Sequence, residues 1–168
     1  MLGPEDFFDL EGNDLDILFE NAEFVWDGLK NIKGYIKDSI KPNVSGIRKN
    51  GSFIINDVVI LDGEVLQEGF SIDGGTVMID GQAADGATVI NAGTTLMDNE
   101  IYIGKGTVIE PGALIKGPSI IGDDNEIRQG AYIRGNVVVG NKCVVGHNTE
   151  MKHAVMLGGS KAGHFAYI

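Results

Sequence analysis

A period of six residues runs through the second half of the chain and limits its fold more than any other feature. Ten of eleven positions in this series hold a large aliphatic residue, and the series reads Ile103, Ile109, Ile115, Ile121, Ile127, Ile133, Val139, Val145, Met151, Leu157 and then Gly163. The residue four positions after each is small or medium in size. This pattern predicts a coil with three flat faces, in which the large residue fills the interior and the small one lets the chain bend. Three hexapeptides complete one coil, so residues 18 apart stack on one face of a parallel β-helix, about 4.8 Å from each other.

The first hundred residues follow other patterns. Residues 21–40 carry apolar side chains at three- and four-residue steps, namely Val25, Leu29, Ile32, Ile36 and Ile40. This spacing predicts one buried helical stripe, which Pro42 ends, and a short helical turn is expected at residues 15–19. Beyond Val44, short β-prone runs such as those at 53–55, 58–60 and 76–79 alternate with Asp-Gly and Gly-Gly turns. We therefore expect a mainly β chain with a helical segment at 1–50, irregular β coils at 51–100 and the hexapeptide β-helix at 101–168.

Charge and composition exclude several classes of function. The formal net charge is -11, and residues 1–99 carry 18 acidic but only 6 basic side chains. Such a negative field argues against nucleic acid and anionic membranes as partners. No apolar run approaches the ~18 residues of a membrane span, and the acidic N-terminus does not resemble a secretion signal. We expect a cytoplasmic protein, in which Cys143, the single cysteine, occupies an inward core position rather than serving as a nucleophile.

Three basic residues occupy equivalent positions in successive coils. Lys116, Arg134 and Lys152 each follow an inward aliphatic residue and are 18 residues apart. Stacked cations repel one another unless an anion lies against them, which favours a phosphate or carboxylate ligand. An ordinary solvated face explains the same column equally well. The sequence leaves both interpretations open.

The repeat falters at residues 157–167, where Gly163 takes an inward position and Lys161 a small-residue position. Local rules tend to fail at functional sites, and glycines here would let a ligand approach the backbone. Histidine is the side chain best suited to general base catalysis near neutral pH, so His164 is the candidate for the base that takes a proton from an amine. His147, His153 and His164 are also candidate zinc ligands, but their gaps of 6 and 11 residues do not match the 18-residue coil. No metal is expected.

Two segments of the last coils carry a family resemblance. Asn-Thr-Glu-Met-Lys at 148–152 and Gly-Ser-Lys-Ala-Gly-His-Phe-Ala-Tyr at 159–167 closely resemble the acetyltransferase domain of the bifunctional glucosamine-1-phosphate acetyltransferase and N-acetylglucosamine-1-phosphate uridylyltransferase. They resemble still more the stand-alone sugar-nucleotide transferases related to that domain. The resemblance covers roughly residues 101–168. It implies a left-handed β-helix, acetyl-CoA as co-substrate, an amino-sugar phosphate as acceptor, a homotrimer and a place in UDP-N-acetylglucosamine biosynthesis.

Site residues transfer from this resemblance one by one. It implies that His164 is the catalytic base, that Arg134 and Lys152 hold the sugar phosphate and that Tyr167 contacts the same substrate. Two departures concern the acceptor, since His147 stands where the family commonly has Asn and residues 135–136 read Gly-Asn instead of Pro-Gly.

Two further departures concern the rest of the family's machinery. The family continues for several coils that bind acetyl-CoA, and we expect this chain to be a fragment that lacks them. The glycine-rich loop of a uridylyltransferase is absent from residues 1–50, so uridylyl transfer is not expected. A non-catalytic β-helix that binds a sugar phosphate or mediates oligomerisation is the alternative function.

Overall fold

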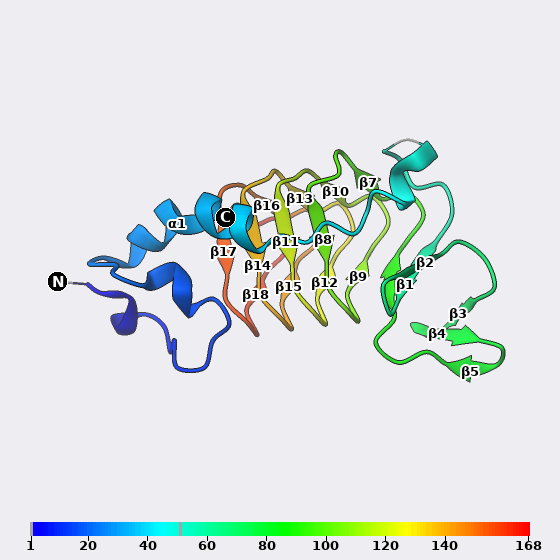
Figure 1. The fold of residues 1–168 in the computed structure, drawn as a ribbon, viewed down its shortest axis with the longest axis horizontal. Coiled ribbons are helices and arrows are strands. Elements are labelled where there is room, and N and C mark those ends of the chain that lie inside the picture. Colours follow the sequence, from blue (N-terminus) through cyan, green and yellow to red (C-terminus); the bar gives the residue numbers. More distant parts are fainter. Residues whose placement is uncertain (1, 51) are drawn as a thin grey trace.

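A parallel β-helix forms the body of the protein (Figure 1). The computed structural model describes residues 2–50 and 52–168. The N-terminal helical segment lies along one side of the last coils, and a small antiparallel sheet lies at the opposite end of the molecule. The architecture is mainly β with one α-helix, as expected for a left-handed β-helix of hexapeptide repeats.

Each coil contributes one strand to each of three parallel sheets. The first sheet contains β7 (Thr95–Leu96), β10 (Leu114–Ile115), β13 (Tyr132–Ile133) and β16 (Glu150–Met151). The second contains β8 (Ile101–Ile103), β11 (Ser119–Ile121), β14 (Val137–Val139) and β17 (Val155–Met156). The third contains β6 (Thr88–Ile90), β9 (Val108–Ile109), β12 (Glu126–Ile127), β15 (Val144–Val145) and β18 (Lys161–Ala162), and β1 (Val58–Leu61) and β2 (Glu64–Leu66) extend it in antiparallel fashion. Parallel pairing therefore begins at β6, within the segment predicted to form irregular coils.

The hexapeptide period builds the interior. Ile115 pairs with Ile133 and Ile133 with Met151, which confirms the 18-residue stacking. The large aliphatic residues from Ile103 to Met151 are at most 1% exposed, so each fills the interior of its coil. Cys143 lies at an inward position and is 1% exposed, as predicted. Burying a side chain of this size contributes roughly 1.5–3 kcal/mol, so the repeat itself supplies most of the core.

The period slips by one residue after Met151. Val139 pairs with Met156 and Val145 with Ala162, a spacing of 17 residues. The corner that follows Ile133 turns through two positive-φ residues, Gly135 and Asn136, whereas the corner that follows Met151 uses only His153, at φ 52. One corner residue is therefore missing.

Because of this slip, the prediction of which residues of the last coil point inward was wrong. Its inward positions are held by Met156 and Ala162 instead of Leu157 and Gly163, and Ile168 packs partly buried against the same core. Lys161 is exposed, and Leu157 packs half-buried beside the N-terminal segment. Gly163 thus follows an inward residue, as Gly146 does.

The predicted long helix is shorter than its apolar pattern suggests. Helix α1 spans Gly28–Ser39 and follows three short 3-10 helices, η1 (Pro4–Asp6), η2 (Asp16–Phe19) and η3 (Val25–Asp27). Asn21, at φ 60, turns the chain where the pattern predicts the start of the helix. Within α1, Ile32 and Ile36 are buried as predicted, whereas Leu29 is 42% exposed.

The N-terminal segment covers the second sheet. Ile32 and Ile36 pack with Val138 of that sheet, and Leu15 and Leu18 complete the cluster. The short turn expected at residues 15–19 is confirmed by η2, in which Leu18 is buried. At 12 residues α1 is the longest helix in the described parts of the chain, and no helix there is long and apolar enough to cross a membrane.

The other end of the β-helix is closed by irregular and antiparallel structure. The 3-10 helix η4 (Ile47–Asn50) precedes β1, and β3 (Ser71–Asp73), β4 (Thr76–Ile79) and β5 (Gln82–Ala83) form a separate antiparallel sheet. The β-prone run at 76–79 is thus confirmed as a strand. The run at 53–55 forms only an isolated antiparallel bridge between Phe53 and Thr95.

Candidate functional site

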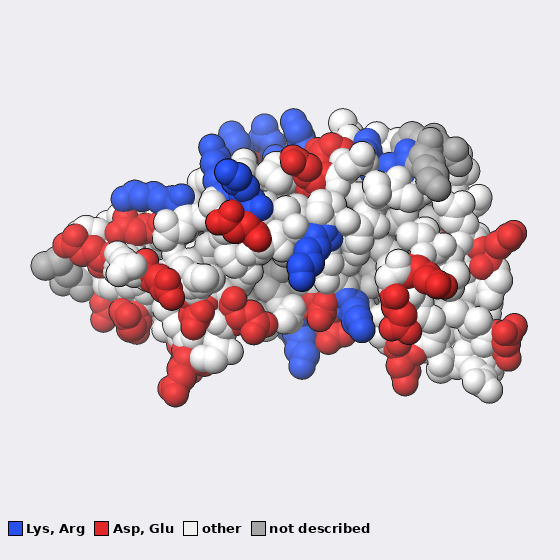
Figure 2. All heavy atoms as spheres, viewed as in Figure 1, with Lys and Arg blue, Asp and Glu red and all other residues white. Residues whose placement is uncertain are grey.

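The predicted column of cations lies along one edge of the first sheet. Because Ile115, Ile133 and Met151 are in register, Lys116, Arg134 and Lys152 occupy equivalent positions in three successive coils, and all three are exposed. We call these residues the cationic edge. Figure 2 shows basic side chains gathered along the upper side of the molecule, over β10, β13 and β16, and acidic side chains mainly along the lower side and the N-terminal end. The predicted stacking is confirmed, and the role of the three residues stays a prediction.

Arg134 already has an acidic partner. Its Nη1 donates a hydrogen bond to Glu150 Oε1 over 2.6 Å, and its guanidinium lies 5.6 Å from the centre of the Tyr132 ring. The hydrogen bond and charge of Glu150 raise the pKa of Arg134 above its ordinary value, so this side chain stays charged. The middle cation of the column therefore has a protein carboxylate against it. Lys116 and Lys152 flank one arginine–glutamate pair.

The strand residues beside the cationic edge form a flat outward face. Thr95, Leu114, Tyr132 and Glu150 precede the inward residues of successive coils, and Tyr167 forms a parallel bridge with Glu150. We call these five residues the tyrosine face. Tyr167 is 70% exposed, and neither Leu114 nor Tyr132 belongs to a hydrophobic cluster of the described residues. The tyrosine face thus differs from the second sheet, which the N-terminal segment covers.

His164 lies at the opposite edge of the same face. It belongs to the corner between β18 and the bridge of Tyr167, and it is exposed. The 17-residue spacing of the last coils places it directly above His147, with the two ring centroids 6.0 Å apart. We call His147, Asn148, His164 and Phe165 the histidine corner. The structure thus places Arg134 and Lys152 along one edge, Tyr167 on the face beside them and His164 across the face from the cations.

Phe165 adopts a backbone conformation that is unusual for its type. Its φ is 56, and the equivalent positions in preceding coils are held by Gly112, Gly130 and Asn148, all at positive φ. Glycine and asparagine tolerate this left-handed region, whereas a bulky residue there costs roughly 1–2 kcal/mol. The Phe165 ring contacts His147 at a centroid distance of 5.3 Å. The corner therefore holds an exposed aromatic ring at an energetic cost.

The three histidines lie in two different corners of the β-helix. His147 and His164 are stacked, but His153 lies in the other corner, between β16 and β17. Across residues 2–50 and 52–168, no three His, Cys, Asp or Glu side chains lie close enough together to hold one metal ion. The spacing argument against a zinc site treated every coil as 18 residues long and so missed the stacking of His147 on His164.

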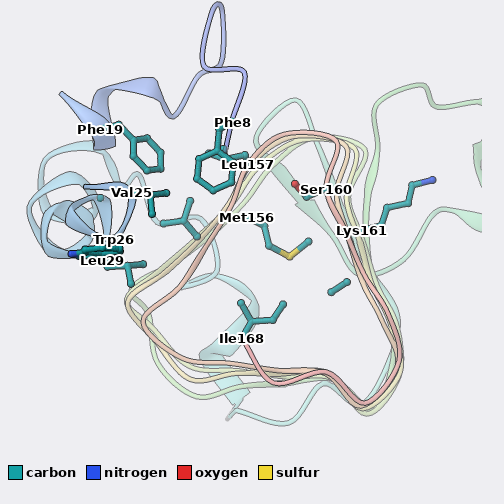
Figure 3. A pocket seen from close by; sticks show the side chains of 13 residues that line it. Phe8, Phe19, Val25, Trp26, Leu29, Met156, Leu157, Ser160, Lys161 and Ile168 are labelled. Atoms are coloured by element: carbon teal, nitrogen blue, oxygen red, sulfur yellow. The ribbon is translucent and has the colours of Figure 1, made fainter. Parts of the chain in front are cut away.

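An apolar cavity is present outside the tyrosine face. It has a volume of about 450 Å³ and lies between the N-terminal segment and the last coil (Figure 3). Phe19, Val25 and Trp26 line one side, and Met156 and Ile168 line the other. Its lining contains no acidic residue and no histidine. We therefore place the candidate site on the tyrosine face and not in this cavity.

Glu150 and His147 are the residues that the sequence analysis did not assign to the site. Glu150 is 16 residues from Arg134, and this diagonal offset becomes a contact only when an 18-residue coil is assumed. The pairing of an acid with a base at that offset was therefore a usable signal. The contact of His147 with His164 depends on the shortened coil, which the sequence pattern does not mark.

The comparisons with known proteins agree with the repeat. A search of curated proteins gave no match to the chain. Residues 100–135 and 118–153 match the family described as bacterial transferase hexapeptide (six repeats). The match lies within the parallel β-helix, so this part of the chain is similar to the hexapeptide repeats of bacterial transferases.

Proposed function

We propose that the protein is an acyltransferase domain that transfers an acetyl group from acetyl-CoA to the amine of an amino-sugar phosphate such as glucosamine 1-phosphate. The observation that carries the proposal is the arrangement of one uncovered face with stacked cations on one edge and an exposed histidine on the other. The match of residues 100–153 to transferase hexapeptide repeats supports the reaction class.

The cationic edge would bind the phosphate. Lys152 and Lys116 are exposed and form no salt bridge within the described residues, so their ammonium groups are available to a dianion. Arg134 is held in place by Glu150 and by the Tyr132 ring, so its remaining N–H groups keep a fixed direction. Charge-assisted hydrogen bonds of this kind are roughly twice as strong as neutral ones. Tyr167, above Glu150, would contact the sugar ring.

His164 would act as the general base. Its imidazole accepts a proton from the sugar amine as the amine nitrogen forms a bond to the acetyl carbonyl carbon. The carbon–sulfur bond then breaks, and the thiolate of the leaving coenzyme takes up a proton. The products are the N-acetylated sugar phosphate and the free thiol. Removing the amine proton in the transition state contributes typically 10²–10⁴-fold to such a reaction.

The width of the face suits a compact acceptor. From His147 to Lys152 the chain runs five residues, which span at most about 16 Å when extended. Lysine and arginine side chains are long and flexible enough to span part of this distance. A sugar phosphate therefore fits between the cationic edge and the histidine corner, with its amine toward His164.

The wider setting of the activity is also proposed. An uncovered face on a β-helix favours association with other copies, and we propose a homotrimer, as is common for hexapeptide β-helices. We further propose that the protein works in the cytoplasm, in UDP-N-acetylglucosamine or related sugar-nucleotide biosynthesis. Light scattering of the purified protein measures the trimer directly, and a monomeric mass would contradict it.

The test is acetyl-CoA-dependent acetylation of glucosamine 1-phosphate by the purified protein. We expect His164→Ala to abolish the reaction and Arg134→Ala and Lys152→Ala to weaken acceptor binding at least tenfold. Lys105→Ala is the matched control, because it removes one exposed charge from a different corner. Acceptor binding without acetylation in any form of the protein would favour the non-catalytic β-helix.

A further inference from the structure

We propose that His147 is a positioning residue that holds the His164 imidazole in one orientation for proton transfer. This inference rests on the proposed function, since it concerns the residue assigned there as the base. The observation behind it is the stacking of two histidines in successive coils, with ring centroids 6.0 Å apart and ring planes at 74°.

The His147 ring is fixed on both of its nitrogen atoms. Nδ1 lies 2.9 Å from the carbonyl oxygen of Gln129, and since a carbonyl oxygen can only accept, Nδ1 donates this hydrogen bond. Nε2 lies 2.9 Å from Asn148 Nδ2 and accepts from it. This pairing fixes the neutral Nδ1–H tautomer of His147. With both nitrogens engaged, His147 is a poor candidate for the base itself.

His164 has the opposite character. It is exposed, and its ring nitrogens form no hydrogen bond to any described residue. They are therefore available to a substrate amine. An exposed histidine otherwise samples several staggered rotamers, and only some of them direct a nitrogen at the amine. An edge-to-face contact between rings is strong enough to shift such an equilibrium by up to about tenfold.

Phe165 also contacts the His147 ring. Its ring meets the His147 ring at 82°, and its backbone N–H donates to the His147 carbonyl oxygen over 2.9 Å. His147 thus contacts the rings of two consecutive residues from the next coil. The left-handed conformation of Phe165, at a position where other coils use Gly or Asn, places its ring against His147. His147 therefore contacts both residues of the next coil, and the His164 nitrogens keep no hydrogen-bond partner among the described residues.

The test compares His147→Asn with His153→Asn. Both variants remove one imidazole, but His153 lies in the other corner and does not contact His164. We expect crystal structures to show a single His164 rotamer in the wild type and in His153→Asn, and several in His147→Asn. In the acetylation assay His147→Asn should lower kcat about tenfold without changing KM for the amino sugar. His153→Asn should change neither constant.

The outcomes separate this inference from the proposed function. One outcome is that His164→Ala loses activity while His147→Asn keeps its kcat and shows a single His164 rotamer. This result would overturn the positioning role of His147 and leave the assignment of His164 as the base intact. Full activity in His164→Ala would overturn the base assignment and with it the catalytic role of His147. Lowered kcat together with scattered His164 rotamers, confined to His147→Asn, supports the inference.

Discussion

Arg134 Nη1 donates a hydrogen bond to Glu150 Oε1 across two neighbouring coils of the β-helix, at a distance of 2.6 Å. Arg134 lies between Lys116 and Lys152, so a carboxylate is bound to the middle residue of the cationic edge. Glu150 therefore has two opposing effects on an anionic ligand. It fixes the direction of the guanidinium, and it cancels part of the positive potential.

Removing the Glu150 charge should strengthen the binding of a simple anion. For Glu150→Gln we expect the affinity for inorganic phosphate to rise about threefold at low ionic strength, because the side chain keeps its size and loses its negative charge. The difference should shrink in 0.5 M NaCl, where exposed charges are screened within about 4 Å. Isothermal titration at both salt concentrations measures the effect.

The chain offers a close control for this change. Arg128 and Glu126 form a similar exposed pair on the third sheet, with Arg128 Nη2 2.7 Å from Glu126 Oε2. Glu126→Gln removes the same charge away from the tyrosine face and should leave phosphate affinity unchanged. Equal gains in both variants would show a general effect of net charge and would contradict a site at the cationic edge.

A second prediction concerns the interior beneath the cationic edge. Ile133 is fully buried and precedes Arg134, so Ile133→Ala leaves a cavity and should lower the free energy of unfolding by about 2–5 kcal/mol. Ile133→Val should cost only about 0.5–1.5 kcal/mol. Urea unfolding followed by circular dichroism measures both. Ile17→Ala, at a side chain that is 50% exposed, is the control and should cost less than about 0.5 kcal/mol.

The sequence was sufficient to predict the repeat and the stacking that follows from it. An inward aliphatic residue at every sixth position is typical of a three-sided β-helix. Once three hexapeptides form one coil, Lys116, Arg134 and Lys152 fall at equivalent positions. The start of the helix was not predictable in the same way. The apolar stripe continues through Asn21–Asp27, but Asn21 at φ 60 and Gly28, packed closely under Phe19, set the boundary.

The last coil shows where periodicity stops being informative. When a corner loses one residue, the inward and outward positions of all later residues move by one. The sequence around His153 contains no glycine or proline that marks the shortened corner. The consequences fall on the candidate site, because the shift turns Lys161 outward and places His164 above His147. The ion pair of Arg134 with Glu150 differs, because their 16-residue offset becomes a predictable contact once an 18-residue coil is assumed.

The shortened corner itself leads to a third prediction. His153 adopts φ 52, a left-handed conformation that asparagine tolerates and β-branched residues do not. His153→Asn should leave the melting temperature nearly unchanged, whereas His153→Val should lower the free energy of unfolding by about 1–2 kcal/mol. Thermal and urea unfolding measure the two variants. Equal stability of both would contradict the left-handed corner and the 17-residue coil that depends on it.

The final prediction concerns pH and the buried thiol. Burial raises the pKa of Cys143, although nearby backbone N–H groups oppose part of this effect, and its Sγ donates to the Leu157 carbonyl oxygen over 3.2 Å. A folded pKa above the unfolded one means that the unfolded chain loses its thiol proton first as pH rises. The stability contribution is therefore complete below the unfolded pKa, about 8.5, and is lost as pH rises toward the higher folded value.

Cys143→Ala isolates this contribution from other titrating groups. The wild type should lose more stability than Cys143→Ala between pH 7.5 and 9.5, and the difference between the two proteins should grow steadily over that range. Urea unfolding at a series of pH values measures it. The folded thiol should also react with iodoacetamide far more slowly than the thiol of the urea-unfolded chain, because the thiolate is the nucleophile and Cys143 is only 1% exposed. A pH dependence identical in both proteins, with rapid alkylation of the folded chain, would show that Cys143 is not held inside the coil.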